Sequence, residues 1–335
     1  MTFLPPSPDQ APGFSDVLAA AERLSGVAVR TRLLEAPLLN DRLGRRVLLK
    51  PECLQRTGSF KYRGASNKIR SIPTADQSGG VVAYSSGNHA QGVAAAARDA
   101  GIPSLIVMPS DAPAIKQANT RAWGAEVVLY DRFTEDREAI GEGIALERGA
   151  ALVRPYDDPM VIAGQGTVGL EIAEDLEAMG ILNCAAVVVP CGGGGLTAGV
   201  SLAISERLPN VPIYAAEPAG FDDTKRSIAA GTQVHVSPDA RSICDSIISP
   251  TPGIITFAIN ARLLSDVAVV TDEEALKAVR TAFLEFKLVV EPGAAVALAS
   301  VLEGRLDLGD GPVVVVVSGG NIDPAMFERA LKTGD

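Results

Sequence analysis

The sequence predicts an α/β protein with two open, mostly parallel, twisted sheets flanked by helices. Short apolar runs alternate with helical patterns along most of the 335-residue chain. Runs such as VVVVV at 313–317 are apolar on both faces, which is typical of strands in a parallel sheet that helices cover on both sides. The alternation falls into two series, and we expect each series to form one sheet, with a cleft between the two.

The first series predicts the smaller sheet. Its apolar runs are short and rich in valine, isoleucine and leucine, whereas the segments between them have helical periodicity. We expect strands at 79–86, 104–109, 126–130 and 151–156, joined by helices at 88–101, 112–124 and 134–148.

The second series predicts the larger sheet. We expect helices at 164–180, after the glycines of 192–195 and at 272–286, with strands at 185–190, 212–218, 267–270 and 312–317. No low-complexity linker interrupts the chain. We therefore assign 1–79 and 158–335 to a large domain and 80–157 to a small one.

Composition and charge argue against several classes of partner. Hydrophobic residues make up 47% of the chain and charged residues 21%, as in an ordinary globular protein. The net charge of −10 argues against nucleic acid or an anionic membrane as partner. No apolar stretch is long enough to span a membrane, the N-terminus lacks the pattern of a signal peptide, and the four scattered cysteines lack metal-site spacing. We expect a cytoplasmic protein with reduced thiols.

The segment CGGGGLTAG at 191–199 predicts a phosphate-binding turn. Gly192, Gly193, Gly194 and Gly195 follow an apolar strand and precede a helix. Consecutive glycines let several backbone N–H groups converge, and the positive end of the helix dipole adds to the attraction for an anion. The segment lacks the features of a P-loop and of a dinucleotide-binding turn, so it favours a single phosphate monoester; a loose connecting loop is the alternative.

A second small-residue turn, SSGNHAQG at 85–92, also joins a strand to a helix. Ser85 and Ser86 can cap that helix, and the free N–H groups of its first turn favour a carboxylate. Simple capping is the alternative. His89 and His235, the two histidines, show no metal-ligand pattern, so we interpret His89 as a packed or surface residue rather than as a metal ligand.

The segment TGSFKYRGA at 57–65 places Lys61 beside an apolar run. One interpretation of these residues is a solvated surface lysine. The other is chemistry, because burial disfavours the charge of a lysine and lowers its pKa, which makes the amine a better nucleophile and base.

Four segments of the chain resemble, in this order, motifs of the pyridoxal-phosphate enzymes of the threonine dehydratase and serine racemase family. They are SFKYRGA, SSGNHAQG, CGGGGLTAG and VSGGN at 317–321. This family belongs to fold type II, the tryptophan synthase β group, in which the cofactor lies in the cleft between the domains. The resemblance spans about residues 20 to 330 and implies a homodimer.

The resemblance implies a role for each motif. Lys61 would carry the cofactor aldehyde, Phe60 would lie against one face of the pyridine ring, and Asn88 would lie near the ring hydroxyl. Two loops would bind the anionic groups: Gly192, Gly193, Gly194, Gly195 and Leu196 the cofactor phosphate, and Ser85, Ser86, Gly87, Asn88 and His89 the substrate carboxylate.

Ser318 would meet the ring nitrogen, and its chemistry favours elimination. A carboxylate at that position would keep the pyridine protonated and make the ring a strong electron sink. A neutral hydroxyl makes a weaker sink, which suits prompt departure of a β-leaving group. Ser86 would lie on the opposite face, either as a second acid/base that permits racemisation or only as a carboxylate ligand.

The segment AAEPAGFDDTKRS at 215–227 resembles the divalent-cation segment of racemase-type members. Glu217 and Asp223 would supply carboxylates and Phe221 a backbone oxygen to Mg²⁺, Ca²⁺ or Mn²⁺. A solvated acidic loop is the alternative.

Two further positions bear on the substrate. The segment ICDSIISPTPGIITF at 243–257 departs from the Ala-Asp-Gly pattern of the family, so it leaves the substrate open, and Ser249 is a candidate contact for its side chain. Arg137 matches an arginine near the active-site mouth of racemase-like members. It would suit a second substrate carboxylate, although exposed helix arginines are usually solvated.

These features predict a dehydratase that uses pyridoxal phosphate to convert a small β-hydroxy amino acid to a 2-oxo acid and ammonia. Serine, threonine and 3-hydroxyaspartate are the candidate substrates. One alternative is a serine or aspartate racemase with side dehydratase activity. Another is a non-catalytic phosphometabolite-binding protein, in which Lys61 would only pair with a phosphate.

Overall fold

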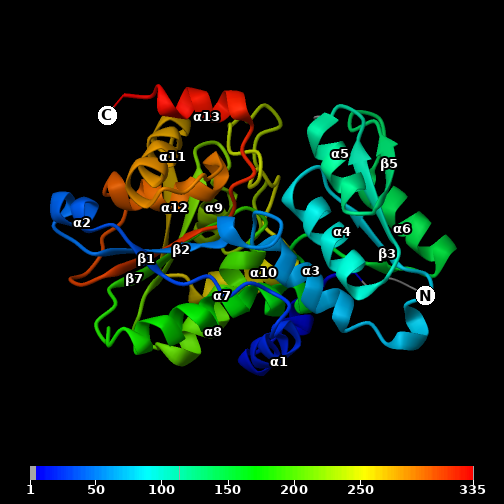
Figure 1. Cartoon of the computed structure of the whole chain (residues 1–335), viewed down its shortest axis with the longest axis horizontal. Coiled ribbons are helices and arrows are strands. Elements are labelled where there is room, and N and C mark those ends of the chain that lie inside the picture. The colour runs from blue at the N-terminus through cyan, green and yellow to red at the C-terminus, as the bar shows by residue number, and fades with distance from the viewer. Residues whose placement is uncertain (1–4, 113, 335) are drawn as a thin grey trace.

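The computed structural model describes residues 5–112 and 114–334, which form the two predicted sheets (Figure 1). The larger sheet has six strands, in the order β1 (Leu34–Glu35), β2 (Val47–Pro51), β10 (Val313–Val317), β7 (Ala186–Pro190), β8 (Ile213–Pro218) and β9 (Asp266–Val270). Neighbouring strands are parallel, except that β1 runs antiparallel to β2. β10 therefore lies in the interior of the sheet although it comes from the far end of the chain.

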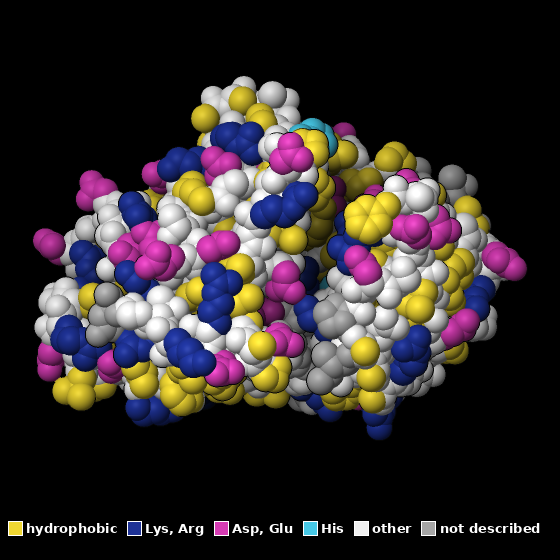
Figure 2. Space-filling model, turned by 90° about the horizontal axis from the view of Figure 1, so that it is seen from above, with side chains coloured by type: hydrophobic (Ala, Val, Ile, Leu, Met, Phe, Trp, Pro, Cys, Tyr) yellow, Lys and Arg dark blue, Asp and Glu magenta, His cyan; other side chains and the backbone are white. Residues whose placement is uncertain are grey.

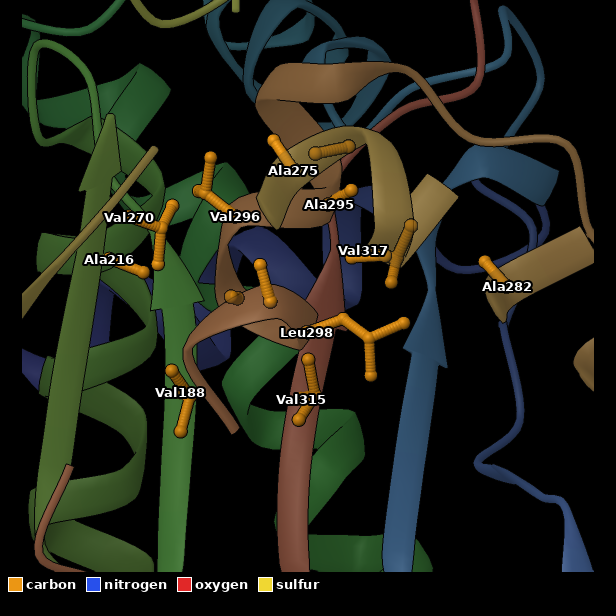
Figure 3. Packing of buried hydrophobic residues seen from close by; sticks show 14 of the residues in the cluster. Val188, Ala216, Val270, Ala275, Ala282, Ala295, Val296, Leu298, Val315 and Val317 are labelled. Carbon is orange, nitrogen blue, oxygen red and sulfur yellow. The ribbon is translucent and has the colours of Figure 1, made fainter. Parts of the chain in front are cut away.

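The residues of β10 divide between two hydrophobic cores because successive side chains of a strand point to opposite faces. On one face they pack with α11 (Asp272–Phe286), α12 (Pro292–Leu302) and α13 (Pro324–Leu331), and on the other with α7 (Pro159–Ala178) and α8 (Gly195–Arg207). In Figure 3, Val315 and Val317 lie on the first face, near Leu298 of α12. Cover on both faces is what the unbroken valine run predicted.

The smaller sheet has four parallel strands, in the order β5 (Glu126–Tyr130), β4 (Ser104–Pro109), β3 (Val81–Tyr84) and β6 (Ala151–Leu152). The helix α4 (Asn88–Ala100) covers one face, with α5 (Ala114–Ala122) beside it, and α6 (Arg137–Arg148) covers the other. All four strands fall within the range predicted for the small domain.

Between the two halves of the molecule lies α3 (Lys61–Arg70) (Figure 1). Its Tyr62, Ala65 and Ile69 share a hydrophobic core with α4 and the smaller sheet. Its other side packs closely on α7: a Cβ at Gly64 would lie 2.9 Å from the carbonyl oxygen of Val161, so this approach requires glycine. The core thus continues across the predicted boundary at residue 79, and the domain limits stay a prediction.

The remaining elements are α1 (Phe14–Leu24), α2 (Pro37–Leu43), α9 (Asp223–Ala230), α10 (Ile254–Leu263) and 3₁₀ turns at Pro8–Gln10, Glu52–Leu54 and Thr74–Asp76. The side chains of Asp136 and Asp158 cap α6 and α7, which moves both helix starts away from the predicted residues 134 and 164. Within the described ranges, no helix is long and apolar enough to cross a membrane.

Candidate active site

The carboxyl ends of strands from both sheets meet at a cleft, where ligands bind in open α/β folds. Figure 2 shows the surface hollowed between the two halves of the molecule. A cavity of about 570 Å³ has a lining that includes Tyr84, Arg137, Arg154, Pro155 and Tyr156. It adjoins the site through Pro155, which contacts Lys61, but its lining contains no residue of the four motifs. Three of the four motifs directly follow the strands β3, β7 and β10, and the lysine motif follows β2 after one 3₁₀ turn.

Lys61 is the first residue of α3 and lies in the cleft. Its Nζ donates a hydrogen bond to the backbone oxygen of Pro155 at 2.7 Å and lies 5.1 Å from the centre of the Phe60 ring. Burial lowers the pKa of Lys61 to about 8, against the opposing charge of Glu291. The amine therefore loses its proton more readily than an ordinary lysine, as the chemical interpretation predicted.

The glycines after β7 form a cradle that side chains would fill. A Cβ at Gly193 would lie 2.4 Å from the Tyr156 ring, and a Cβ at Gly192 would lie 2.9 Å from the backbone of Ile247. Gly194 has φ +89°, a conformation that favours glycine. α8 begins at Gly195, so the unpaired amides of its first turn and the positive end of its dipole face the cradle formed by the glycines. The geometry suits a phosphate monoester.

Three residues that sequence reasoning missed hold this turn in place. Thr256 donates to the carbonyl oxygen of Gly193 at 2.6 Å, and the Nδ2 of Asn260 donates to that of Gly194 at 3.2 Å. Asp157 in turn accepts from the first amides of α10, including that of Ile254 at 2.8 Å. These bonds occupy the carbonyl groups of the turn and leave its N–H groups for an anion.

The turn after β3 corrects one expectation. The N-cap of α4 is Gly87 rather than either serine, and it makes no side-chain capping bond. Ser85 instead accepts a hydrogen bond from the amide of Gly87 at 3.2 Å. The first-turn amides of α4 consequently have no side-chain cap and remain available to a carboxylate.

His89 is packed, which was one of the two interpretations. Its Nε2–H donates to the carbonyl oxygen of Val153 at 2.9 Å, and its side chain is buried. Burial lowers the pKa of His89 to about 3, so the ring is neutral. Its place in the substrate-carboxylate loop stays a prediction.

The turn after β10 joins the lysine motif. The amide of Phe60 donates to the carbonyl oxygen of Ser318 at 3.0 Å, and Ser59 forms a β-bridge with Gly319. Ser318 itself is buried. The two motifs therefore form one wall of the site although most of the chain separates them.

Glu291 is a second feature that the sequence analysis missed. This buried acid accepts a hydrogen bond from the Nδ2 of Asn88 at 2.6 Å, across the cleft. Its signal in the sequence was an acid between an apolar run and a proline, in LVVEPGAA at 288–295. That pattern does not say which distant residue the carboxyl will contact.

Arg137 lines the cavity. Its guanidinium carbon is 5.6 Å from the centre of the Tyr84 ring, and no ion pair occupies it in the described part of the chain. Arg154, which lines the same cavity, pairs with Glu142 at 2.9 Å. Ser249 is half-buried and lies two residues after Ile247, which is close to Gly192 of the glycine turn. Its contact with the substrate side chain stays a prediction.

The two acids of the predicted cation site, Glu217 in β8 and Asp223 at the start of α9, are buried rather than solvated. Glu217 accepts from the amides of Thr224 and Lys225 at 3.0 and 3.1 Å, and the Oδ2 of Asp223 has no hydrogen-bond partner among the described residues. Burial raises the pKa of Glu217 to about 8 and that of Asp223 to about 7. Phe221 is also buried. No group of three or more metal-ligating side chains gathers in the described ranges, so the cation site stays a prediction.

A family profile described as "Pyridoxal-phosphate dependent enzyme" matches residues 24–319. The chain belongs to this family. Its residues fit the cofactor, since the glycine cradle suits a phosphate monoester and Lys61 presents its amine to the same cleft.

The relatives of this pyridoxal-phosphate enzyme are similar over nearly its whole length. The L-threo-3-hydroxyaspartate ammonia-lyase of Saccharomyces cerevisiae is 41% identical, over 96% of each chain. That of a Pseudomonas species is 42% identical, over 96% of this chain and 99% of its own. The structure of maize serine racemase has a TM-score of 0.89 at 35% identity, over 96% of this chain and 97% of that one. These findings confirm the predicted fold type, the cofactor and the dehydratase type of enzyme.

Proposed function

We propose that this enzyme is an ammonia-lyase that converts 3-hydroxyaspartate to the corresponding 2-oxo acid and ammonia. Arg137 carries the proposal. Its side chain lines the cavity, with the guanidinium over the Tyr84 ring, and no carboxylate of the described residues pairs with it. It is therefore available to a second substrate carboxylate, which serine and threonine lack. The substrate in the names of the yeast and Pseudomonas relatives supports the same choice.

The chain's own residues would bind the cofactor and set its reactivity. Pyridoxal phosphate, when bound, supplies a conjugated electron-withdrawing ring that acidifies the α-proton of an attached amino acid. The amides of the glycine turn at 192–195 would hold its phosphate. Ser318 would offer a neutral hydroxyl to the ring nitrogen, which favours prompt loss of the β-hydroxyl.

Substrate binding and proton transfer fall to residues on both sides of the cleft. The first-turn amides of α4 would bind the α-carboxylate, and Arg137 the β-carboxylate. Lys61, whose pKa burial lowers to about 8, would take the α-proton as general base. The β-hydroxyl leaves as water and a second water replaces the nitrogen, so that the net products are a 2-oxo acid and ammonia.

The test is an assay of 2-oxo acid release from serine, threonine and the stereoisomers of 3-hydroxyaspartate. We expect 3-hydroxyaspartate to have the highest kcat/KM, and Arg137→Met to lower that value about 100-fold while serine turnover changes less than about threefold. Arg148→Met is the matched control, because Arg148 lies on the same helix and pairs with Glu126 on the surface. Equal loss for serine and 3-hydroxyaspartate in Arg137→Met would reject this substrate.

A racemase is the second candidate, and the position of Ser86 favours it. The Ser86 hydroxyl caps no helix and hydrogen-bonds no other described residue, so it is free to exchange a proton with a substrate. If Ser86 is an acid/base, Ser86→Ala loses D-serine formation and D-substrate turnover while L-substrate elimination persists. If it only binds carboxylate, both activities weaken together, mainly through KM.

The proposal includes a homodimer in the cytoplasm. The side chains of Leu38 on α2 and Leu284 on α11 are 70% and 42% exposed, and an ion pair between Arg42 and Glu285 joins the two helices. An exposed apolar surface of this kind supports self-association. Sedimentation of the purified holoenzyme at twice the mass of one chain is the expected result.

A further inference from the structure

Glu291 occupies a helix N-cap position without capping the helix. Its backbone is extended at the start of α12, where a side-chain oxygen usually accepts from the first-turn amides, yet no such bond forms. The N-cap side chains that do cap their helices include those of Asp136, Asp158, Thr271 and Asp323. Only 3% of Glu291 is exposed, and its Oε1 accepts from the Nδ2 of Asn88 at 2.6 Å. The carboxyl serves the cleft rather than its own helix.

Asn321 fixes the other end of the Asn88 amide. The Nδ2 of Asn321 donates to the backbone oxygen of Thr57 and to the Oδ1 of Asn88, each at 2.8 Å. Because both protons of that amide are used, the Oδ1 of Asn88 must face Asn321 and its Nδ2 must face Glu291. Gly319 leaves room for the arrangement, since a Cβ there would lie 2.1 Å from the Oε1 of Glu291.

We propose that Glu291 and Asn321 are positioning residues that fix the orientation of the Asn88 amide, so that its second N–H donor faces the cofactor. The inference rests on the cofactor and on the predicted place of Asn88 beside the ring hydroxyl, not on the substrate of the proposed function. A flipped amide would present an oxygen where the ring needs a donor, and it would leave the buried carboxyl of Glu291 without its hydrogen bond.

The charges around Glu291 leave this role intact in either protonation state. Burial, helped by Asp245, raises the pKa of Glu291 to about 8, while the bond from Asn88 and the charges of Lys116 and Lys61 oppose the rise. Glu291 also interacts electrostatically with the thiols of Cys53 and Cys244, and burial holds both thiols protonated by raising each pKa to about 12. Protonated or not, the carboxyl keeps an oxygen that can accept from Asn88.

A double-mutant cycle on cofactor affinity tests the proposal. The apoprotein is titrated with pyridoxal phosphate, and the absorbance and induced circular dichroism of the bound cofactor are recorded. Glu291→Met removes the acceptor and should weaken cofactor affinity about 10- to 100-fold, whereas Glu291→Gln keeps an acceptor and should stay within about threefold. In an Asn88→Ala background, Glu291→Met should add less than about twofold, because its effect passes through Asn88.

Two further variants keep the test decisive. Asn321→Ser should likewise weaken cofactor affinity when Asn88 is present and have almost no effect in Asn88→Ala. If Glu291→Met does not fold, Asn321→Ser takes its place in the double-mutant cycle. Glu274→Gln is the control for removing the charge of a buried acid, because Glu274 belongs to the capping box of α11 and not to the site. This variant should lower the melting temperature without changing cofactor affinity. Equal losses in both backgrounds would overturn the proposal. Because the readout is cofactor binding, the result does not depend on which amino acid is turned over.

Discussion

Two lysines near the start of the chain, Lys50 in the core and Lys61 partly buried at the cleft, have different roles. Lys50 is fully buried, and its Nζ donates to Glu171 at 2.6 Å within a network that also contains Arg63 and Glu52. Among the described residues, the acceptor of the Lys61 amine is the carbonyl oxygen of Pro155. Burial lowers the pKa of Lys50, but the charges of Glu171 and Glu52 oppose that change. The acceptor of Lys61 is neutral, and burial lowers the pKa of Lys61 to about 8. This difference makes Lys61 suitable as the nucleophile and Lys50 suitable as a structural cation.

Lys61→Ala should abolish turnover and leave the fold intact. The amine carries both nucleophilic and general-base work, so its loss should cost several powers of ten in rate. The assay is ammonia release, and thermal unfolding of the apoprotein is the control for structure. Near wild-type ammonia release from the variant would contradict the assignment.

His89 should make the protein sensitive to acid. Its pKa is about 3 in the folded state and near 6.5 when unfolded, so the unfolded chain binds a proton between these values and the folded one does not. The stability that neutral His89 contributes is complete above about pH 6.5 and falls by up to about 1.4 kcal/mol for each pH unit below it. Urea unfolding at pH 7, 6 and 5 should show a smaller decline in His89→Gln than in the wild type. The same decline in both proteins would show that His89 does not titrate on unfolding.

At the scale of elements, the sequence predicted β3 to β10, the helices α4 to α8 and α11, because their signals are local. It did not predict the strand β1, nor helices such as α3, α10 and α12. The valine runs, the glycines of 192–195 and the serines after β3 lie within a few positions of the elements that they begin or end. Helix starts were less accurate. The caps at Asp136 and Asp158 depend on single side-chain bonds, which periodicity does not reveal.

The rest of the site could not be predicted because it depends on contacts between distant segments. Thr256 and Asn260 reach the glycine turn from α10, and Glu291 reaches Asn88 from the start of α12. Each of these residues is an ordinary polar residue in its local sequence. Only the packing of α10 on α8, and of α12 on the larger sheet, brings them to the cleft.

The glycine turn between β7 and α8 gives a prediction at this scale. In Gly193→Ala the new Cβ would lie 2.4 Å from the Tyr156 ring, so either the ring or the turn must move. We expect pyridoxal-phosphate affinity to fall by at least about tenfold, because displaced amides no longer converge on the phosphate. Equilibrium titration of the apoprotein measures the change.

Gly143→Ala is the matched control for that substitution. Gly143 lies in α6, and a Cβ there would meet nothing within 4 Å. Replacing an interior helix glycine by alanine stabilises a protein by about 0.5–1 kcal/mol. Gly143→Ala should therefore melt slightly higher and bind the cofactor as the wild type does. Wild-type affinity in both variants would show that the shape of the turn does not matter.

At the scale of the whole molecule, polar bridges hold the two halves together across the cleft. Lys116 of α5 pairs with Asp245 at 2.7 Å, in the segment that also contains Ser249. Asn88 of α4 meets Glu291 on the other side. The smaller sheet thus closes over the site through its own helices, while the cofactor turns belong mainly to the larger sheet.

Removing a divalent cation should lower the stability of the whole molecule if the predicted site after β8 is real. A ligand that binds only the native state adds RT ln(1 + [L]/Kd), or about 1.4 kcal/mol for 1 mM Mg²⁺ at a site of about 0.1 mM affinity. EDTA should then lower the melting temperature by a few degrees, and Asp223→Ala should remove that sensitivity. An unchanged melting temperature and unchanged activity in EDTA would reject the site.

The position of β10 has a consequence for how the protein is made. A ribosome completes β2 and β7 long before β10, the strand that pairs with both of them. Until β10 emerges, two apolar strand edges inside the larger sheet lack a partner, and such edges invite aggregation. Ser318 and the bridge between Gly319 and Ser59 follow at once. The nascent chain therefore completes its sheet and its cofactor site in a single late step. A premature stop before Val313 would yield a chain that chaperones must shield, with neither a finished fold nor a place for the cofactor.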